Sequence, residues 1–390
     1  YDMESKENQE NELYLQNQLI TYIGNKRALL DFIGQEIKVV QEKLGKEKLE
    51  CLDIFSGSGI VSRYLKQFSS SITTNDLEAY SCIINRCYLS DLDEKQLEDL
   101  RDLYKKLNEK IDERMRELER AREENRYVEP GFISKYYAPK NIDDISKEER
   151  CFYTPYNANY LDVARQEIES IVPDEYKDFF IAPLLSEASI HANTAGIFKG
   201  FYKNSKTGTG QFGGNGKNAL SRIMGQIRLP FPVFSNYKCN HRVFNENAND
   251  LIDKEELGHF DLAYFDPPYN QHPYGSNYFM LNLIANYKTP DPEKMSRVSG
   301  IPSDWNRSAY NKKGKVADVF IDLVKKVNAK FVLISFNSDG FISRDEMVSL
   351  LNQCGKVNVV ESKYNTFRGS RNLKERDVHV KEYLFLVEKD

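Results

Sequence analysis

Residues 49–65 read LECLDIFSGSGIVSRYL, and this stretch decides the fold class. Leu49 to Phe55 is an apolar run of strand length, SGSG predicts a tight turn, and IVSRYL begins a segment with helical spacing of apolar residues. Downstream, Ser71 to Thr74 predicts a second strand and Glu78 to Leu89 a second helix. Strands that alternate with helices in this way predict an open α/β sheet.

The alternation stops near Ser90 and returns near His241. Between them, residues 93–126 are dense in both charges and predict a long exposed helix, and an amphipathic helix is expected near 162–171. Further strands are expected at 261–265, 330–336, 356–361 and 380–387, with a helix at 316–328. We therefore predict one α/β domain, residues 1–90 and 243–390, interrupted by a mostly helical insertion at 91–242.

Composition narrows the class of protein. Hydrophobic residues make up 40% of the 390 and charged residues 29%, which is typical of a globular protein in water. The sequence has no apolar run near the roughly 18 residues that span a bilayer, and its first residues are acidic and polar, so we expect a cytoplasmic protein. The six cysteines form no C-x-x-C pair, so we expect neither a disulfide framework nor a metal site.

The sequence Asp266-Pro267-Pro268-Tyr269 follows an apolar strand directly. Two prolines remove two backbone donors and fix two φ angles, so the chain leaves the sheet as a stiff peptide with free carbonyls. Such a stretch can be a simple strand-terminating turn. It can also be a pocket in which Asp266 and the Pro267 carbonyl accept hydrogens from an amine on a flat ring, and Tyr269 stacks on that ring.

Three further segments suit a ligand site. Gly57 and Gly59 lie in the turn between a strand and a helix, where a ligand can approach the backbone, although no third glycine completes a dinucleotide motif. Asp76 follows the second strand and can accept hydrogen bonds from two ribose hydroxyls, or cap the next helix. Lys26, in TYIGNKRALL, is either a solvated lysine or a cation for a ligand carboxylate.

In this order, these segments resemble the amino-group DNA methyltransferases of the α class, the family that includes the Dam-type and FokI-type modification enzymes. The similarity extends to VLISFNSDGFIS at 332–343 and to 363–389, and covers about 20–90 and 243–389. The resemblance implies a Rossmann-like class I methyltransferase sheet with an inserted target-recognition domain. It also implies transfer of a methyl group from S-adenosylmethionine to the N6 amine of an adenine.

The resemblance assigns roles to individual residues. The methyl donor would be bordered by Asp53, Phe55, Gly57 and Gly59, and its other contacts would be Asp76 at the ribose, Lys26 near the carboxylate, Tyr22 and Asn247. In VFNENANDLI the family often has an acid near the donor adenine, whereas this chain has Asn247 at that position. Asp266, Pro267, Pro268 and Tyr269 would act on the target adenine, which must be flipped out of the duplex.

A DNA partner is also indicated by charge. The net charge is −5, yet residues 188–245 contain no Asp or Glu and eight Lys or Arg. A cationic block of this kind suits a phosphate backbone. The predicted DNA contacts are Lys199, Lys203, Lys217 and Arg222, with Arg307, Arg368 and Arg371 from two later loops.

Other functions stay open at this point. An RNA adenine methyltransferase would use the same chemistry, and a non-catalytic DNA-recognition subunit would keep the fold. A protein-glutamine methyltransferase would usually carry Asn in place of Asp266. A cognate restriction endonuclease is an expected partner, because modification enzymes of this kind work beside one.

Overall fold

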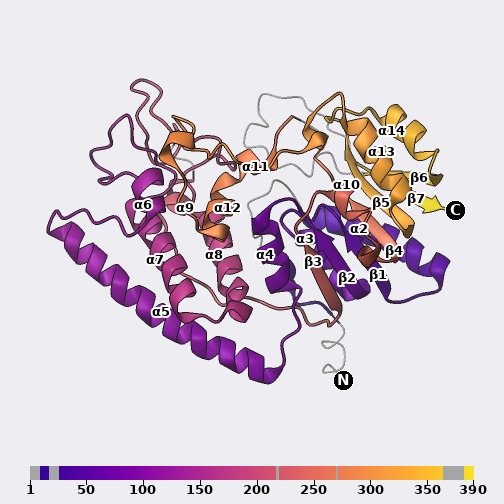
Figure 1. Cartoon of the computed structure of the whole chain (residues 1–390), viewed down its shortest axis with the longest axis horizontal. Helices are drawn as coiled ribbons and strands as arrows, with labels where there is room; N and C mark the ends of the chain where they lie inside the picture. The colour runs from indigo at the N-terminus through magenta and orange to yellow at the C-terminus, as the bar shows by residue number, and fades with distance from the viewer. Residues whose placement is uncertain (1–8, 17–25, 217–218, 269–270, 363–381) are drawn as a thin grey trace.

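The computed structural model describes residues 9–16, 26–216, 219–268, 271–362 and 382–390. Within them, seven strands form one sheet beside a lobe of helices (Figure 1). The strands are β1 (Leu49–Asp53), β2 (Ser69–Asn75), β3 (Asn240–Phe244), β4 (Phe260–Phe265), β5 (Ala329–Asn337), β6 (Gly355–Glu361) and β7 (Glu382–Lys389).

The α-helices lie both around the sheet and in the separate lobe (Figure 1). Their bounds are α1 (Glu12–Gln16), α2 (Lys26–Leu44), α3 (Ile60–Leu65), α4 (Ala79–Tyr88), α5 (Glu94–Glu123), α6 (Phe132–Tyr137), α7 (Pro155–Ile171), α8 (Asp178–Ile190), α9 (Leu220–Met224), α10 (Ala248–Leu251), α11 (Tyr274–Asn277), α12 (Phe279–Asn286), α13 (Val316–Lys326) and α14 (Arg344–Leu351). Among the described helices, none has the length and apolarity that crossing a bilayer requires.

The strand order is β3-β2-β1-β4-β5-β7-β6. β7 is antiparallel to both of its neighbours, and the remaining neighbours pair in parallel. β1, β2 and β3 follow one another towards one edge of the sheet, and β4 and β5 follow one another towards the other edge. In an open parallel sheet, ligands bind outside the carboxyl ends of the strands where the order reverses in this way. The α/β fold class predicted from the sequence is confirmed.

Helices cover both faces of the sheet because successive side chains of a strand point to opposite faces. In β4, Leu262 and Tyr264 pack in the core formed with α2 and α3, whereas Ala263 and Phe265 pack in the core formed with α10, α13 and α14. All residues of β4 are buried. A strand buried on both faces is mostly apolar, and apart from Asp261, which pairs with Lys46, this holds for β4, so it could be recognised in the sequence.

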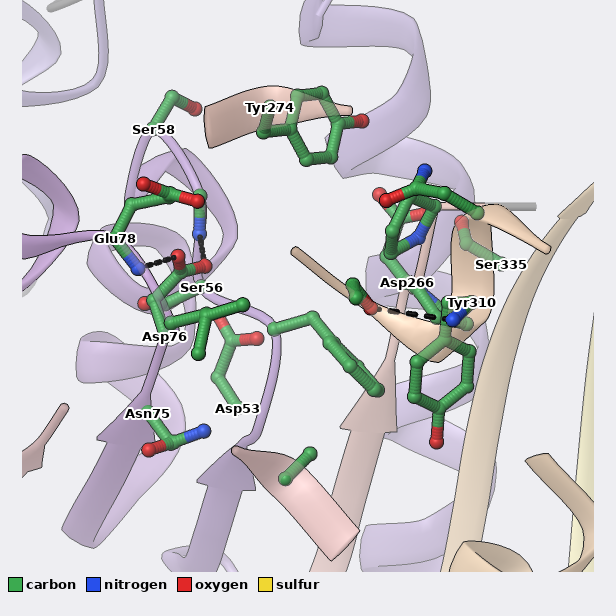
Figure 2. Close-up of a pocket in the computed structure, with 18 of the residues that line it drawn as sticks. Asp53, Ser56, Ser58, Asn75, Asp76, Glu78, Asp266, Tyr274, Tyr310 and Ser335 are labelled. Carbon is green, nitrogen blue, oxygen red and sulfur yellow. Dashed lines mark hydrogen bonds between the residues drawn. The ribbon is translucent and has the colours of Figure 1, made fainter. Parts of the chain in front are cut away.

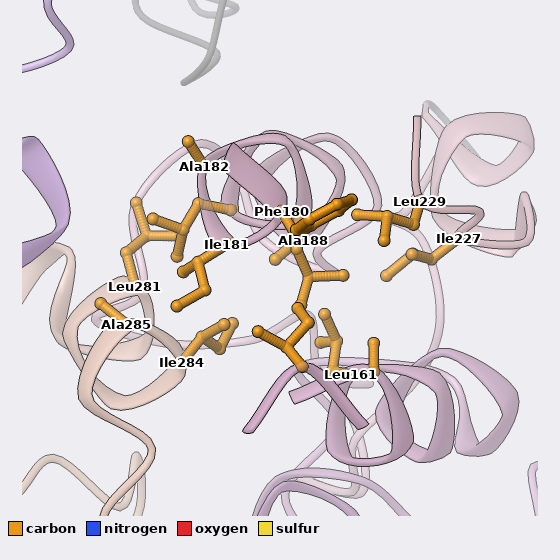
Figure 3. Close-up of a cluster of buried hydrophobic side chains, with 14 of the residues drawn as sticks. Leu161, Phe180, Ile181, Ala182, Ala188, Ile227, Leu229, Leu281, Ile284 and Ala285 are labelled. Atoms are coloured by element: carbon orange, nitrogen blue, oxygen red, sulfur yellow. The ribbon is translucent and has the colours of Figure 1, made fainter. Parts of the chain in front are cut away.

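A third core holds the helical lobe together (Figure 3). Its central side chains include Leu161 of α7, Phe180 and Ala188 of α8, and Leu281 and Ile284 of α12. The charged segment predicted as an exposed helix is α5, but one face of it joins this core through buried residues such as Leu100, Leu107 and Ile111. The predicted long helix is therefore present, with one face buried against the lobe and the rest of its surface outside this core.

The helical lobe draws on more than the inserted segment 91–242. Tyr80 and Ile84 of α4, and Met280 and Leu281 of α12, contribute to its core. α12 lies just beyond the Asp266 turn in the chain, so this helix connects β4 to the lobe. β3 begins inside the expected insertion and was not predicted as a separate strand. The exact division at 91 and 242 stays a prediction.

Candidate active site

A cavity of about 560 Å³ opens at the carboxyl edge of the sheet (Figure 2). Its walls come from the ends of β1, β2, β4 and β5 and from the residues that follow β3, together with α11 and a segment near 306–311. It lies where the strand order reverses between β1 and β4. The volume lies within the range of sites for small organic ligands.

Asp53 lies at the end of β1 and is 1% exposed. Ser62 donates its hydroxyl to Asp53 Oδ2 at 2.5 Å, while Oδ1 has no hydrogen-bond partner among the described residues. Burial raises the pKa of this carboxyl to about 7, Ser62 opposes the shift, and the charges of Asp266 and Asp76 add to it. A buried acceptor without a donor favours a ligand that brings a proton donor or a positive charge.

The glycine turn and Asp76 form one unit. Gly57 and Gly59 have φ of 51° and 80°, and a Cβ on Gly59 would lie 2.7 Å from Asn85 Oδ1. Asp76 accepts the backbone N–H of Gly57 at Oδ2 and that of Glu78 at Oδ1, both at 2.8 Å. Burial raises the pKa of Asp76 to about 6 against these bonds. Asp76 thus links the turn to the β2–α4 loop, and Glu78 occupies the cap position of α4.

Glu78 lines the same cavity and is 3% exposed. Its Oε2 accepts the side-chain amides of Asn282 at 2.6 Å and Asn306 at 3.1 Å. The side-chain oxygen of Asn282, Oδ1, accepts the Tyr80 backbone N–H at 3.1 Å, which fixes the orientation of the Asn282 side-chain amide. Burial raises the pKa of Glu78 to about 7, and the hydrogen bond from Asn282 opposes the shift. One carboxylate therefore ties the β2–α4 loop to α12 of the helical lobe and to the segment at 306.

The Asp266 turn forms the facing wall. Asp266 is exposed and Pro267 is buried at the end of β4. Asp266 lies across the cavity from Asp76 and Glu78 (Figure 2). Pro267 and Pro268 have no N–H, so the backbone presents only acceptors there. This wall can therefore accept hydrogens from an amine that enters the cavity.

Phe55 contributes an aromatic wall. Its ring packs edge-on against Phe265, with centroids 6.3 Å apart, and against Tyr310, at 5.1 Å. Tyr310 is held in turn by a hydrogen bond from its hydroxyl to Asn249 Oδ1 at 2.8 Å. These contacts fix the rings before any ligand arrives. A fixed apolar wall beside acidic acceptors suits a ligand with both a flat ring and polar groups.

Asn247 lines the cavity, but its side-chain oxygen also caps α10. It accepts the backbone N–H groups of Asn249 at 3.0 Å and Asp250 at 3.3 Å. The neighbouring Glu246 lines the cavity too, pairs with Lys254 through Oε1, and leaves Oε2 buried without a partner among the described residues. An acid is thus present beside the position where the sequence suggested that none remained.

Several predicted residues lie outside the described part of the chain. Lys26 is the first residue of α2, but its side chain is outside that part. The same holds for the whole of Tyr22, Lys217, Tyr269, Arg368 and Arg371. Their predicted roles stay predictions.

Of the predicted DNA contacts whose side chains the structure describes, three are exposed. Lys199 and Lys203 are exposed on loops of the helical lobe, with the Lys203 ammonium 5.1 Å from the centre of the Phe201 ring. Arg307 is exposed and stacks on Trp305, its guanidinium carbon 4.0 Å from the ring centre.

Arg222 has a different role. Its guanidinium donates to the carbonyls of Ile190 at 2.6 Å, Ala192 at 2.8 Å and Thr194 at 3.2 Å. The side chain therefore holds the segment that follows α8, and it is not available for a phosphate without breaking these bonds. The prediction that Arg222 contacts DNA is therefore not supported by its position.

The sequence profile of the D12 class N6 adenine-specific DNA methyltransferases matches residues 22–350. The chain belongs to this family. It is 32% identical over 375 residues to the type II methyltransferase M.CviAII of Paramecium bursaria Chlorella virus 1, covering 94% of this chain and 98% of the relative. It is 29% identical to M.NlaIII of Neisseria lactamica, covering 95% and 99%. With M.FokI of Planomicrobium okeanokoites the identity is 26%, covering 95% of this chain but 52% of the relative.

Membership identifies the chain as an adenine-specific DNA methyltransferase that uses S-adenosylmethionine. The cavity fits this donor: the unpaired Asp53 oxygen suits a positively charged ligand, and the glycine turn leaves the backbone open. When bound, the donor supplies an electrophilic methyl group on a sulfonium. The flipped adenine would approach from the Asp266 side.

The sequence reasoning missed several cavity residues. Glu78 could have been found, because it follows Asp76 by two positions at the same strand end. Tyr274, Asn306, Tyr310 and Ser335 carry no local signal, since they reach the cavity from elements far apart in the chain.

Proposed function

We propose that this chain is the modification enzyme of a type II restriction–modification system, with a cognate endonuclease that cleaves the same site in unmethylated duplex DNA. The names of the relatives M.CviAII and M.NlaIII support a type II system. The substrate would place the enzyme in the cytoplasm with the chromosome. In this proposal the sheet domain binds the donor, and the inserted segment, together with α12, contacts DNA.

In the proposed mechanism, Asp266 and the Pro267 carbonyl each accept a hydrogen bond from one of the two hydrogens of the adenine N6 amine. The lone pair of that nitrogen is delocalised into the ring, which makes it a poor nucleophile. Hydrogen bonds to both hydrogens draw the nitrogen towards tetrahedral geometry and aim its lone pair at the methyl group. Tyr269 would stack on the flipped base in place of its neighbours in the duplex. The methyl group would pass directly to N6 as its bond to the donor sulfur breaks, S-adenosylhomocysteine would leave, and one N6 proton would be lost to solvent, with no covalent enzyme intermediate.

Donor binding is assigned to the opposite wall. Each Asp76 oxygen already accepts one backbone N–H and has a further lone pair. These lone pairs would accept hydrogen bonds from the ribose hydroxyls of the donor. Asp53 would face the charged end of the donor. Phe55, Gly57 and Gly59 border the same space. The position of Asp266 across one cavity from these residues is the observation that carries the proposal (Figure 2).

The test is to sequence DNA from cells that express the chain, with a method that reads N6-methyladenine directly. We expect methylated adenine at one short recurring site, and resistance of that DNA to an endonuclease that cleaves there. The Asp266→Ala variant serves as the matched control and should leave the DNA unmodified. Unmodified DNA from wild-type cells, with methylation found in RNA instead, would contradict the proposal.

A further inference from the structure

Residues 296–301 form a tight turn between α12 and the segment that lines the cavity. Ser296 and Ile301 are joined by a backbone hydrogen bond of 2.9 Å, and the Gly300 N–H donates to the Ser296 carbonyl at 3.0 Å. Gly300 has φ of +68°, a conformation that favours glycine. The sequence therefore specifies the backbone of this turn.

An arginine from the helical lobe braces the turn. Arg150 donates to the carbonyl of Arg297 at 3.2 Å and to that of Val298 at 3.3 Å. A longer contact of 3.4 Å reaches the Ser296 carbonyl. Three successive carbonyls thus face one guanidinium. Charged donors make stronger hydrogen bonds than neutral ones, so this side chain holds the turn in one conformation.

Two more contacts fix the other side of the turn. The buried Tyr137 donates its hydroxyl to the Gly300 carbonyl at 2.7 Å, and Ser299 donates to the Lys199 carbonyl at 2.5 Å. A Cβ on Gly300 would lie 2.8 Å from both Tyr137 and Arg150. Ser299 and Gly300 therefore pack against the lobe, whereas Ser296, Arg297 and Val298 are exposed. Arg297 and Val298 form the tip of the turn.

The tip carries an apolar side chain beside a cation. Val298 is 55% exposed and Arg297 is also exposed, whereas Ser299 and Gly300 are buried. A single exposed valine is ordinary on a protein surface. Val298 differs because its backbone is held on both sides. Arg150 donates to the carbonyls of Arg297 and Val298, and Tyr137 donates to that of Gly300.

A short chain of contacts connects the tip to the active site. Ile197 and Asn277 line the cavity, and the Phe198 N–H donates to the Asn277 carbonyl at 2.7 Å. Lys199, whose carbonyl accepts from Ser299, is two residues beyond Ile197, a span of at most ~7 Å. The turn is therefore linked to the cavity wall through Ser299, Lys199 and the adjoining residues Phe198 and Ile197.

We propose that this turn contacts the DNA next to the flipped adenine, with Val298 entering the base stack and Arg297 binding an adjoining phosphate. The inference rests on the proposed duplex substrate and goes beyond it by naming the element that holds the duplex open. Proteins that deform DNA insert apolar side chains between base steps in this way. A braced turn suits this task because it loses little conformational entropy on binding. Lys199, whose carbonyl accepts the Ser299 hydroxyl, and Lys203, four positions further along, are both exposed and give this surface the charge that DNA requires.

The test uses a duplex carrying 2-aminopurine at the methylated position of the site mapped in expressing cells. The fluorescence of this base rises when it leaves the stack. Val298→Ala should reduce the flipped fraction about tenfold, since the wedge no longer offsets the cost of unstacking. Its donor affinity and the salt dependence of its DNA binding should match those of the wild type. Arg297→Ala should instead lower the slope of log K against log salt by about 1.

Val128→Ala is the matched control, because Val128 is an exposed valine of similar exposure, 49%, in the loop after α5 and outside the turn. It should flip the base normally. A second duplex, with the target adenine in a mismatch, lowers the cost of flipping, so the deficit of Val298→Ala should shrink there.

Normal flipping by Val298→Ala, or an equal deficit on matched and mismatched duplexes, would overturn the role of the turn. A wild-type enzyme that methylates no duplex would instead overturn the proposed function.

Discussion

The two lobes hold their functional side chains in opposite ways. In the sheet lobe, Asp53 and Glu78 are buried and Asp76 is tied to two backbone N–H groups, so these acids are in place before a ligand binds. In the helical lobe, the candidate contacts Lys199 and Lys203 lie exposed on loops. Chemistry needs a few groups at fixed positions, whereas attraction to a phosphate backbone needs many charges at loosely fixed ones.

The same contrast exists within the cationic stretch 188–245. Arg222 donates to three backbone carbonyls, and Arg242 donates to the Thr73 hydroxyl and to the carbonyls of Glu256 and Leu257. These arginines stabilise the fold. The excess of positive charge in the sequence therefore overstates how many cations can reach DNA.

The largest expected effect is at Asp266. Asp266→Ala should lower the methylation rate by at least about 10²–10³-fold, because it removes a fixed acceptor that acts on the reacting amine. The affinity for S-adenosylmethionine should stay near that of the wild type, since the proposed donor contacts, Asp53 and Asp76, line the opposite wall of the cavity. Single-turnover rates with a labelled donor, together with calorimetry, measure both. Near-normal turnover would end the assignment of Asp266.

A smaller effect is expected at Asp76. Asp76→Ala should weaken donor binding about 5- to 150-fold, as expected for the loss of hydrogen bonds worth about 1–3 kcal/mol. Its affinity for duplex DNA should change little. Calorimetry with the donor and fluorescence anisotropy with a duplex test the two lobes separately. Unchanged donor affinity would move the donor site elsewhere.

On the helical lobe, the effect should appear in the salt dependence. The double variant Lys199→Ala, Lys203→Ala should lower the slope of log K against log salt by about 2, one for each lost phosphate contact. Donor affinity should not change. The matched control replaces Lys105 and Lys106, two exposed lysines of α5, and should leave the slope as it is. Equal slopes in both variants would mean that the loop lysines face solvent.

A last effect, which reports stability and not function, concerns pH. Burial raises the pKa of Asp53 from 3.8 to about 7, so between these values the folded protein holds a proton that the unfolded chain has released. The contribution of this group to stability therefore falls as pH rises through that interval, by at most about 1.4 kcal/mol per pH unit. Asp53→Asn removes the titration.

Without donor, the melting temperature of Asp53→Asn relative to the wild type should be higher at pH 8 than at pH 5. The exposed Asp318→Asn, on α13, serves as the control and should show no such trend. An identical difference in melting temperature at both pH values would show that Asp53 does not titrate in this range.

The sequence predicted most of the sheet and residues on both walls of the cavity. β4 and the Asp266 turn could be recognised because Leu262 to Phe265 is an unbroken apolar run, as a doubly buried strand favours, and two prolines must end it. Asp53 and Asp76 could be found because both follow strands of one sheet. Each of these signals lies within a few neighbouring residues.

The remaining features depend on distant segments. Glu78 acts through Asn282 and Asn306, each more than 200 positions away, and the turn at Val298 is fixed by Arg150, 148 positions earlier. No local pattern marks such pairs. For the same reason, α12 could not be assigned to the helical lobe before its packing was known.

The most direct test of the account is to identify the methylated atom. The purified chain is incubated with duplex DNA and S-adenosylmethionine that carries a labelled methyl group, and the DNA is then digested to nucleosides. We predict that the label appears in N6-methyldeoxyadenosine alone, and that Asp266→Ala, which still binds the donor, yields none. Label in a cytosine nucleoside, or equal labelling of adenine by the variant, would contradict the proposed chemistry.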